Sequence, residues 1–470
     1  MHLRGYIDKA KRLFKLIGES IRGTDYDYTQ IRLSKAILLL SIPMILEMVM
    51  ESVFAIADIW FVSHLGDEAI ATVGVTESLN TVVYAIGFGL SIAITAMVSR
   101  RIGAHQPERA ARAAGQAIML TLIISTAIAI PGAIYADRIL MMMGLSEEMA
   151  KANAGYTSIM LGSNVIVMLL FVNNAIFRSA GNAAISMKVL WFANILNIIL
   201  DPCLIFGLGP FPELGIKGAA IATSIGRGLA VVWQLILLFN GRGRVKLKLK
   251  HLKPSTSRMI KLLNLSWSAI LQNIIATASW IVLMRLMANY GSEVLAGYTI
   301  AIRIIMFCLL PSWGVSNAAS TLTGQNMGAH RPDRAERAVW VTGKVNVVLL
   351  GLISLVLILW PETFIGIFTS QEGIILSGAE GLRIISFGMA AYGLGMVMHQ
   401  SFNGAGDTRT PMWLNLVSFW IIEIPLAWIL AVTLNMEEAG VFYAILIAES
   451  TLTILGVWFF KRGRWKSRLI

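Results

Sequence analysis

Twelve long apolar stretches constrain this chain more than any other feature. They cover roughly 36–62, 79–99, 114–136, 154–177, 184–206, 215–240, 263–289, 304–324, 339–360, 381–402, 411–434 and 438–460. At a rise of about 1.5 Å per residue, each stretch is long enough to cross a bilayer as an α-helix. The composition agrees, because 14% charged residues is well below the roughly 25% of a soluble chain. The sequence therefore predicts an all-α polytopic membrane protein with twelve transmembrane helices.

The charges of the connecting segments alternate along the chain. Basic residues gather at 100–112, 178–188, 241–262, 331–337 and 461–470, and acidic residues dominate most of the other loops. By the positive-inside rule the basic side is cytoplasmic, which places both termini in the cytoplasm and the protein in the cytoplasmic (inner) membrane. The net charge of +12 is thus explained by topology, and no nucleic-acid partner is expected. We expect the lipid bilayer to surround the chain.

These patterns divide the chain into five parts. We expect a basic amphipathic segment at 1–35, a first lobe of six spans at 36–240, and a basic cytoplasmic linker at 241–262. A second lobe of six spans follows at 263–460, and a basic cytoplasmic tail at 461–470 ends the chain. A frayed, solvated tail is the alternative for the first segment.

An internal repeat supports the division into two lobes. Segments 225 positions apart align at Ser41–Leu46 with Ser266–Leu271, Gly103–His105 with Gly328–His330, and Phe177–Gly181 with Phe402–Gly406. An even number of spans in each half makes the two repeats parallel. Two such bundles around a site near the middle of the membrane are typical of transporters. For the repeated histidines, a turn is favoured over proton chemistry.

The first apolar stretch carries three carboxylates, Glu47, Glu51 and Asp58. A helix turns about 100° per residue, so all three lie on one stripe of the helix surface. Acids facing lipid are costly, so the stripe should face a wet cavity or buried partners. Pro43 lies about one turn before Glu47, where it weakens the helix and predicts a hinge.

Two interpretations of Glu47 and Glu51 stay open. They either form an acidic wall of a cavity for cationic substrates or pair with Arg227 in the interior of the same lobe. The other candidate cavity residues are polarizable or polar side chains within the spans, namely Met48, Met50, Phe54, Gln272, Asn273 and His399. A packing role is the stronger interpretation of His399.

In the second lobe, Glu423 and Glu449 lie in the middle of their spans, and Arg285 lies within another. Structural pairing of these acids with Arg285 is favoured over a cavity role. The two cysteines, Cys203 and Cys308, indicate neither a disulfide framework nor a metal site, and no cofactor is expected.

Six motifs together resemble the multidrug and toxic compound extrusion (MATE) family. They lie at 41–44, 57–66, 100–104, 196–202, 215–223 and 404–408, and the resemblance covers essentially all of 36–460. It implies two six-helix lobes around a V-shaped cavity. It also implies a secondary antiporter, not an enzyme, that exports amphipathic, usually cationic compounds in exchange for H⁺ or Na⁺. We expect a monomer that binds a small-molecule substrate.

The resemblance implies roles for five positions. Asp58, Asn197, Asp201 and Thr223 match the family's coupling residues in the first lobe, and Pro43 matches the proline at which the first helix bends. Independently, Asn197 and Asp201 are four residues apart and share a helix face. Two carboxylates close together in the membrane repel, which favours carrying a proton. The same oxygens could instead ligate Na⁺, and the sequence leaves the coupling ion open.

Other functional classes fit less well. The family's second branch has coupling carboxylates in helices seven and ten, where this chain has Gln272, Asn273, His399 and Gln400. A lipid-linked saccharide flippase of the same superfamily is the alternative function, but it would need a basic cavity for phosphate. The pattern Gly404-Ala-Gly-Asp407 matches intramembrane aspartyl proteases, yet Asp407 begins a loop. The loop signature of major-facilitator carriers is missing from 99–112.

Overall fold

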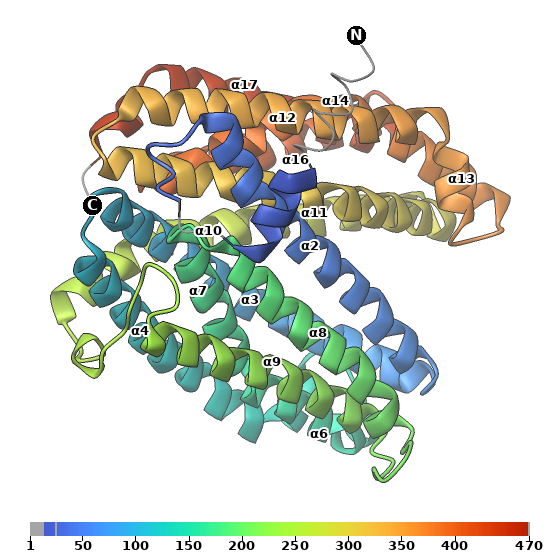
Figure 1. Cartoon of the computed structure of the whole chain (residues 1–470). Helices are drawn as coiled ribbons and strands as arrows, with labels where there is room; N and C mark the ends of the chain where they lie inside the picture. Colours follow the sequence, from blue (N-terminus) through green and yellow to red (C-terminus); the bar gives the residue numbers. More distant parts are fainter. Residues whose placement is uncertain (1–13, 24–25, 469–470) are drawn as a thin grey trace. The chain divides into compact units, whose positions relative to one another are not determined.

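The computed structural model describes residues 14–23 and 26–468, and every regular element in them is a helix (Figure 1). The long and short α-helices are α2 (Leu33–Ser63), α3 (Asp67–Gly103), α4 (Pro107–Ile134), α5 (Ala136–Met142), α6 (Glu147–Gly162), α7 (Asn164–Ser179), α8 (Ala183–Ile205), α9 (Ile216–Asn240), α10 (Thr256–Met287), α11 (Ser292–Gly328), α12 (Pro332–Leu359), α13 (Pro361–Gly366), α14 (Glu372–Ala405), α15 (Arg409–Asn415), α16 (Ile424–Trp428) and α17 (Glu437–Lys461). Other helical turns are η1 (Leu249–His251), η2 (Ala288–Tyr290), η3 (Leu416–Glu423), η4 (Ile429–Thr433) and η5 (Arg464–Ser467).

Twelve helical segments in the described part of the chain are long and apolar enough to cross a membrane, which confirms the predicted number. Several are longer than predicted. For example, α3 begins at Asp67 and α11 at Ser292, although we expected these spans to begin at 79 and 304. Hydropathy ends a span at the first polar residues, whereas the helical backbone continues past them. As a result Glu77, which we assigned to a loop, lies within α3.

The chain divides into two compact units. The first unit contains Met1–Tyr26 and Leu46–Ser266, and the second contains Asp27–Ile45 and Trp267–Ile470. The predicted lobes differ at their start, because the first part of α2 belongs to the second unit. The change of unit follows Ile45, two residues after Pro43, which lies inside the unbroken helix α2.

The backbone turns of the two halves repeat the sequence register. His105 and His330 both adopt left-handed φ angles, of 55° and 57°, at the ends of α3 and α11. Gly181 and Gly406 do the same after α7 and α14, with φ of 92° and 82°. Residues 225 positions apart therefore close corresponding helices in the same way, as the predicted turn role of the histidines requires.

Two of the spans are not regular helices. The fourth is interrupted at Ser163, where α6 ends and α7 begins. The eleventh combines α15 and α16 with the wider π-helical turns η3 and η4. Pro425 lies at the start of α16 and has no backbone N–H to donate. π-Helical turns often accompany functional sites, and Glu423 is the last residue of η3.

Segments at the ends of the spans are fixed by specific contacts. The side chain of Gln116 on α4 donates to the backbone oxygens of His251 and Lys253 at 2.9 and 2.7 Å. These contacts attach the basic linker to the first unit, and α10 already begins at Thr256 within the predicted linker 241–262. In the amino-terminal segment, residues 14–22 are helical, and the basic residues before them lie outside the described residues.

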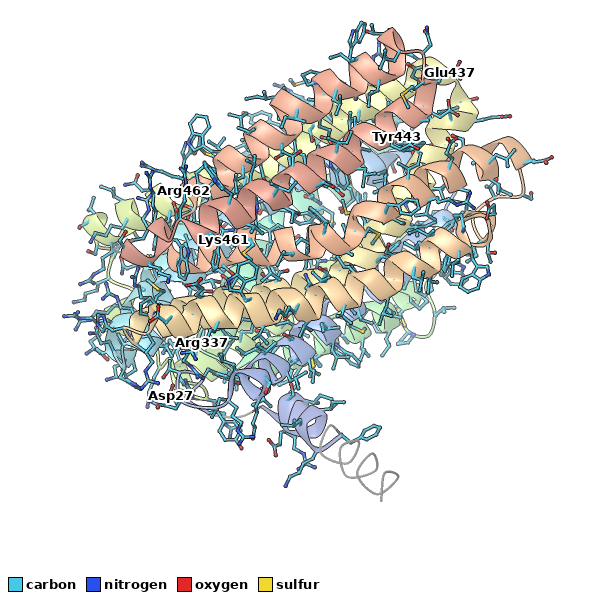
Figure 2. All side chains as sticks on the ribbon, turned by 90° about the horizontal axis from the view of Figure 1, so that it is seen from above. Asp27, Arg337, Glu437, Tyr443, Lys461 and Arg462 are labelled. Carbon is cyan, nitrogen blue, oxygen red and sulfur yellow. The ribbon has the colours of Figure 1, made fainter. Side chains whose placement is uncertain are left out.

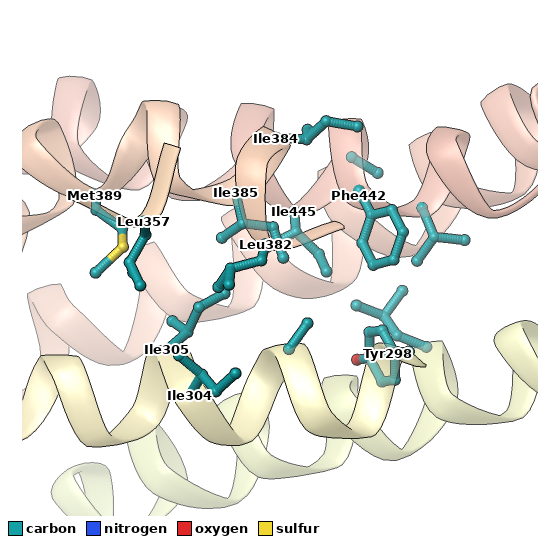
Figure 3. Close-up of a cluster of buried hydrophobic side chains, with 14 of the residues drawn as sticks. Tyr298, Ile304, Ile305, Leu357, Leu382, Ile384, Ile385, Met389, Phe442 and Ile445 are labelled. Carbon is teal, nitrogen blue, oxygen red and sulfur yellow. The ribbon is translucent and has the colours of Figure 1, made fainter. Parts of the chain in front are cut away.

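The core of the second unit is a large cluster of buried apolar side chains from α11, α14 and α17. Figure 3 shows Tyr298, Leu382 and Phe442 within it. The rings of Tyr298 and Phe442 stack with their centroids 6.2 Å apart. Figure 2 shows α17 from Glu437 at one end to Lys461 and Arg462 at the other, the charge distribution expected of a membrane span.

After α17 the chain folds back on its own unit. Trp465 in η5 is only 1% exposed, although it belongs to the segment that we predicted as a basic tail. Its ring stacks on Phe460 at 4.8 Å, and its indole N–H donates to the carbonyl oxygen of Phe460 at 3.0 Å. The last turn of the described chain is therefore part of the folded core.

Candidate functional site

Two of the three carboxylates of the acidic stripe of α2, Glu47 and Glu51, form ion pairs with basic side chains of the first unit. Glu47 is 1% exposed, and its Oε1 lies 3.0 Å from Nη1 of Arg178 in the last turn of α7. The expected partner, Arg227, is therefore wrong for Glu47. Arg178 looked like a loop residue because it follows the apolar stretch, but α7 continues through it to Ser179. Glu47 is thus a buried ion-pair partner and not part of an exposed acidic wall.

Glu51 is the carboxylate that contacts Arg227. Its Oε1 lies 3.4 Å from Nη2 of Arg227 on α9, and its Oε2 accepts from Nδ2 of Asn194 at 3.1 Å. The guanidinium of Arg227 also lies over the ring of Phe54, 5.2 Å from its centroid. Because about a third of the Glu51 side chain is exposed, this pair keeps some access to solvent.

Three of the four predicted coupling residues form one hydrogen-bonded group. Asp201 on α8 is 0% exposed. With the Asn197 amide nitrogen facing it, Nδ2 of Asn197 donates to Oδ2 of Asp201 at 2.9 Å. In that orientation Oδ1 of Asn197 accepts from the hydroxyl and backbone N–H of Thr223, at 3.0 and 2.9 Å. The second carboxylate oxygen, Oδ1 of Asp201, is buried without a hydrogen-bond partner. The group thus holds one acid oxygen in place and leaves the other free.

The fourth residue, Asp58 on α2, is partly exposed and lies within electrostatic range of Asp201.

Sequence reasoning missed three further neighbours. Glu77 interacts electrostatically with Asp58 and accepts a hydrogen bond from Asn80, while Tyr84 is hydrogen-bonded to Arg227. Tyr156 on α6 is buried within electrostatic range of both aspartates. Glu77 lies ten residues after the start of α3, and its place only two residues before the predicted span 79–99 was the signal that could have indicated this position.

The residues predicted to line a cavity differ in exposure. In the first unit Met50 and Phe54 are buried, whereas Met48 is partly exposed. Pro43 is buried within α2. Burial therefore leaves Met48 and Glu51 as the accessible members of the set in this unit.

In the second unit, the predicted cavity residues belong to a network of amides. Nε2 of Gln272 donates to Oδ1 of Asn403 at 3.1 Å, and Nδ2 of Asn403 donates back to Oε1 of Gln272 at 3.2 Å. Asn273 is partly exposed and donates to the carbonyl oxygen of Ala269. His399 hydrogen-bonds with Asn415, while its Nε2 is buried without a partner. Gln272 is buried, so its contacts are those of a packing residue.

The expected pairing of Glu423 and Glu449 with Arg285 is wrong. The side chain of Arg285 is exposed, and neither glutamate takes part in an ion pair in the described residues. The two glutamates instead interact electrostatically with each other. The sequence could not reveal that these two glutamates are neighbours. Helical periodicity shows on which face of a helix a residue lies, but not which other helix packs against that face.

The arrangement in the first unit is suited to binding a small cation. Three acids, Glu51, Asp58 and Glu77, are electrostatic neighbours of Arg227. A fourth, Asp201, is an electrostatic neighbour of Asp58 and is oriented by Asn197. Among the described residues, no group of three or more His, Cys, Asp or Glu side chains has the arrangement of a metal site. Proton exchange at a carboxylate, or weak ligation of a monovalent cation by oxygens, is the chemistry that such a group can perform.

Both halves of the chain match one family model. The MatE model matches residues 43–203 and again residues 268–429. The two matches begin 225 positions apart, which is the offset of the internal repeat.

Similar proteins match over nearly the whole chain. A probable multidrug resistance protein NorM of Thermotoga maritima is 25% identical over 442 residues, covering 93% of this chain and 94% of that protein. A protein named FAD transporter, of Shewanella oneidensis, is 24% identical over 84% of this chain and 87% of that protein. The solved outward-facing structure of a multidrug resistance MATE family transporter of the MOP superfamily superposes with a TM-score of 0.86 at 25% identity, over 94% of this chain and 98% of that one.

Proposed function

The chain belongs to the MATE family of membrane transporters, and from this premise we propose that it works as a secondary active antiporter. It exports amphipathic, cationic drugs or metabolites and takes up H⁺ or Na⁺ in return, by alternating access. Members of this family are transporters and not enzymes, and the substrate is a small molecule. The protein acts as a monomer in the cytoplasmic membrane, with both termini on the basic, cytoplasmic side.

One observation carries the proposal: in the described part of the first unit, Asp58 and Asp201 form no ion pair with a basic side chain. Arg178 and Arg227 pair with Glu47 and Glu51, but the electrostatic neighbour of the buried Asp201 is a second acid, Asp58. A buried carboxylate without a counter-charge is costly unless it binds a cation or a proton. Asp58 and Asp201 are therefore the residues that load and release the coupling ion.

Asn197 and Thr223 position this pair. Because Asn197 donates to one oxygen of Asp201 and is itself fixed by Thr223, the free Oδ1 of Asp201 keeps one orientation. Pro43, inside α2 and close to the change of unit, is the hinge at which this helix responds to loading.

The test measures efflux of a fluorescent cation from everted membrane vesicles, with a pH gradient and a Na⁺ gradient imposed separately. We expect Asp58→Asn to abolish efflux under the coupling gradient while leaving the amount of folded protein unchanged. Asp333→Asn, whose side chain is 86% exposed, is the matched control and should transport normally. Full activity of Asp58→Asn would overturn the coupling assignment.

The substrate class is tested in the same vesicles. Because one relative is named FAD transporter, the anion FAD is added as a competitor of the fluorescent cation. We expect no competition, since the accessible residues of the acidic stripe favour cations. Inhibition by FAD, or its own accumulation, would contradict the cationic substrate class without affecting the coupling assignment.

A further inference from the structure

A second pair of intramembrane acids, Glu423 and Glu449, lies in the second unit. Glu423 ends the π-helical turns η3, and Glu449 lies on α17, which packs against η3. They are 1% and 9% exposed, and they lie within electrostatic range of each other. In the described residues, neither carboxylate forms an ion pair with a basic side chain. The pair is therefore buried without a counter-charge.

The groups around the pair are hydroxyls and apolar side chains. Tyr298 on α11 lies within electrostatic range of Glu423, and Tyr392 on α14 within range of both glutamates. The buried apolar cluster of Figure 3 has members on the same elements, with Ala444 and Ile445 on α17 and Ala427 on α16, the helix that follows Glu423. Among the described residues, no basic side chain is an electrostatic neighbour of either glutamate.

Glu423 has one hydroxyl neighbour and one oxygen without a hydrogen-bond partner. Ser279 on α10 donates its hydroxyl proton to the carbonyl oxygen of Ala276 at 2.8 Å. Ser279 is also a hydrogen-bond neighbour of Glu423, and its hydroxyl brings no positive charge to the carboxylate. The other oxygen of Glu423, Oε2, is buried and has no hydrogen-bond partner.

From this geometry we infer that Glu423 and Glu449 form a second proton-binding site, in the second unit, which holds one proton between two carboxyl groups. Two ionised carboxylates buried together would repel each other without compensation, and a single proton removes most of that cost. The site has too few charged ligands for a divalent metal, which takes about six oxygen ligands. It goes beyond the proposed coupling at Asp58 and Asp201 and does not depend on it.

The test is infrared spectroscopy of the purified full-length protein in lipid, because only a protonated carboxyl group has the carbonyl stretch of an acid. The spectrum of the double variant Glu423→Gln/Glu449→Gln is subtracted from that of the unsubstituted protein. At neutral pH we expect an acid carbonyl band in the difference, and we expect the band to disappear as the pH is raised. Absence of the band at neutral pH would overturn the inference.

Three controls separate the alternatives. Glu437→Gln, at the exposed start of the same helix α17, should give no acid band. Asp58→Asn should retain the band of the second unit even if it abolishes transport, so the two proposals can fail separately. Loss of the band in NaCl but not in choline chloride would identify Na⁺ as the ligand and overturn the proton assignment. If the double variant does not fold, each single variant is compared in the same way.

Discussion

Glu47 with Arg178 in the first unit and Gln272 with Asn403 in the second occupy positions 225 residues apart. In the first unit the contact is an ion pair with an oxygen–nitrogen distance of 3.0 Å. In the second it is a reciprocal pair of amide hydrogen bonds of 3.1 and 3.2 Å. The same two helices of each repeat are thus joined at the same place by different chemistry.

This difference shows that the two repeats share the positions at which helices contact each other, but not the charges of the residues at those positions. The positions equivalent to Asp58 and Asp201 in the second half are Leu283 and Leu426, which can bind no ion. Conversely, Glu423 and Glu449 correspond to Ile198 and Ser224 in the first half. Each unit therefore contains its own acids, at positions of the repeat that do not correspond.

The largest expected effect comes from breaking the ion pair on one side only. Glu47→Gln leaves the guanidinium of Arg178 mostly buried without its carboxylate, which should lower the free energy of unfolding by about 3 kcal/mol. Thermal unfolding of the detergent-solubilised protein measures the loss.

The matched variant copies the chemistry of the second unit into the first. Glu47→Gln combined with Arg178→Asn recreates the pair formed by Gln272 and Asn403, and should recover most of the lost stability. If the double variant is as unstable as Glu47→Gln alone, the two contacts are not structurally equivalent.

A smaller effect is expected from Asn197→Ala, which removes the amide that joins Asp201 to Thr223. The polar groups left without partners should cost about 1–3 kcal/mol in the same unfolding experiment. Transport should also fall, because the free oxygen of Asp201 loses its fixed orientation. Unchanged transport in Asn197→Ala would indicate that Asp201 is positioned by other contacts.

The smallest effect sharpens the comparison between buried and exposed charge pairs. Glu362→Gln removes the partner of Arg383, in a pair whose side chains are about half exposed. Because solvent screens exposed pairs, we expect a loss below about 1 kcal/mol, less than for either buried substitution. A larger loss would mean that exposure is a poor guide to the importance of ion pairs in this protein.

Much of the architecture could be predicted because hydrophobicity and repetition act along the sequence. The twelve spans follow from hydropathy, and the turns at His105 and His330 follow from the offset of the repeat. The grouping of Asn197 and Asp201 follows from their spacing on one helix face. These features depend on local sequence or on comparison of the two halves.

The contacts between helices could not be predicted in the same way. Arg178 and Glu77 were assigned to loops because charge ends a hydropathy window, although the helical backbone carries both of them. We expected Arg285 to pair with Glu423 because it is a basic residue within another span of the same lobe. The side chain of Arg285 is exposed instead. Which helices lie next to each other depends on packing, and helical periodicity does not contain that information.

The buried ring of Trp465 has a practical consequence for handling the protein. A chain shortened to end at Arg462 would lose this ring and leave a hole beside Phe460, and the missing contacts would cost about 3–5 kcal/mol. An affinity tag or a fluorescent reporter should therefore be placed after Trp465 and its neighbours, through a flexible spacer. Trimming the terminus to aid crystallisation would remove the contact between Trp465 and Phe460 at the end of α17.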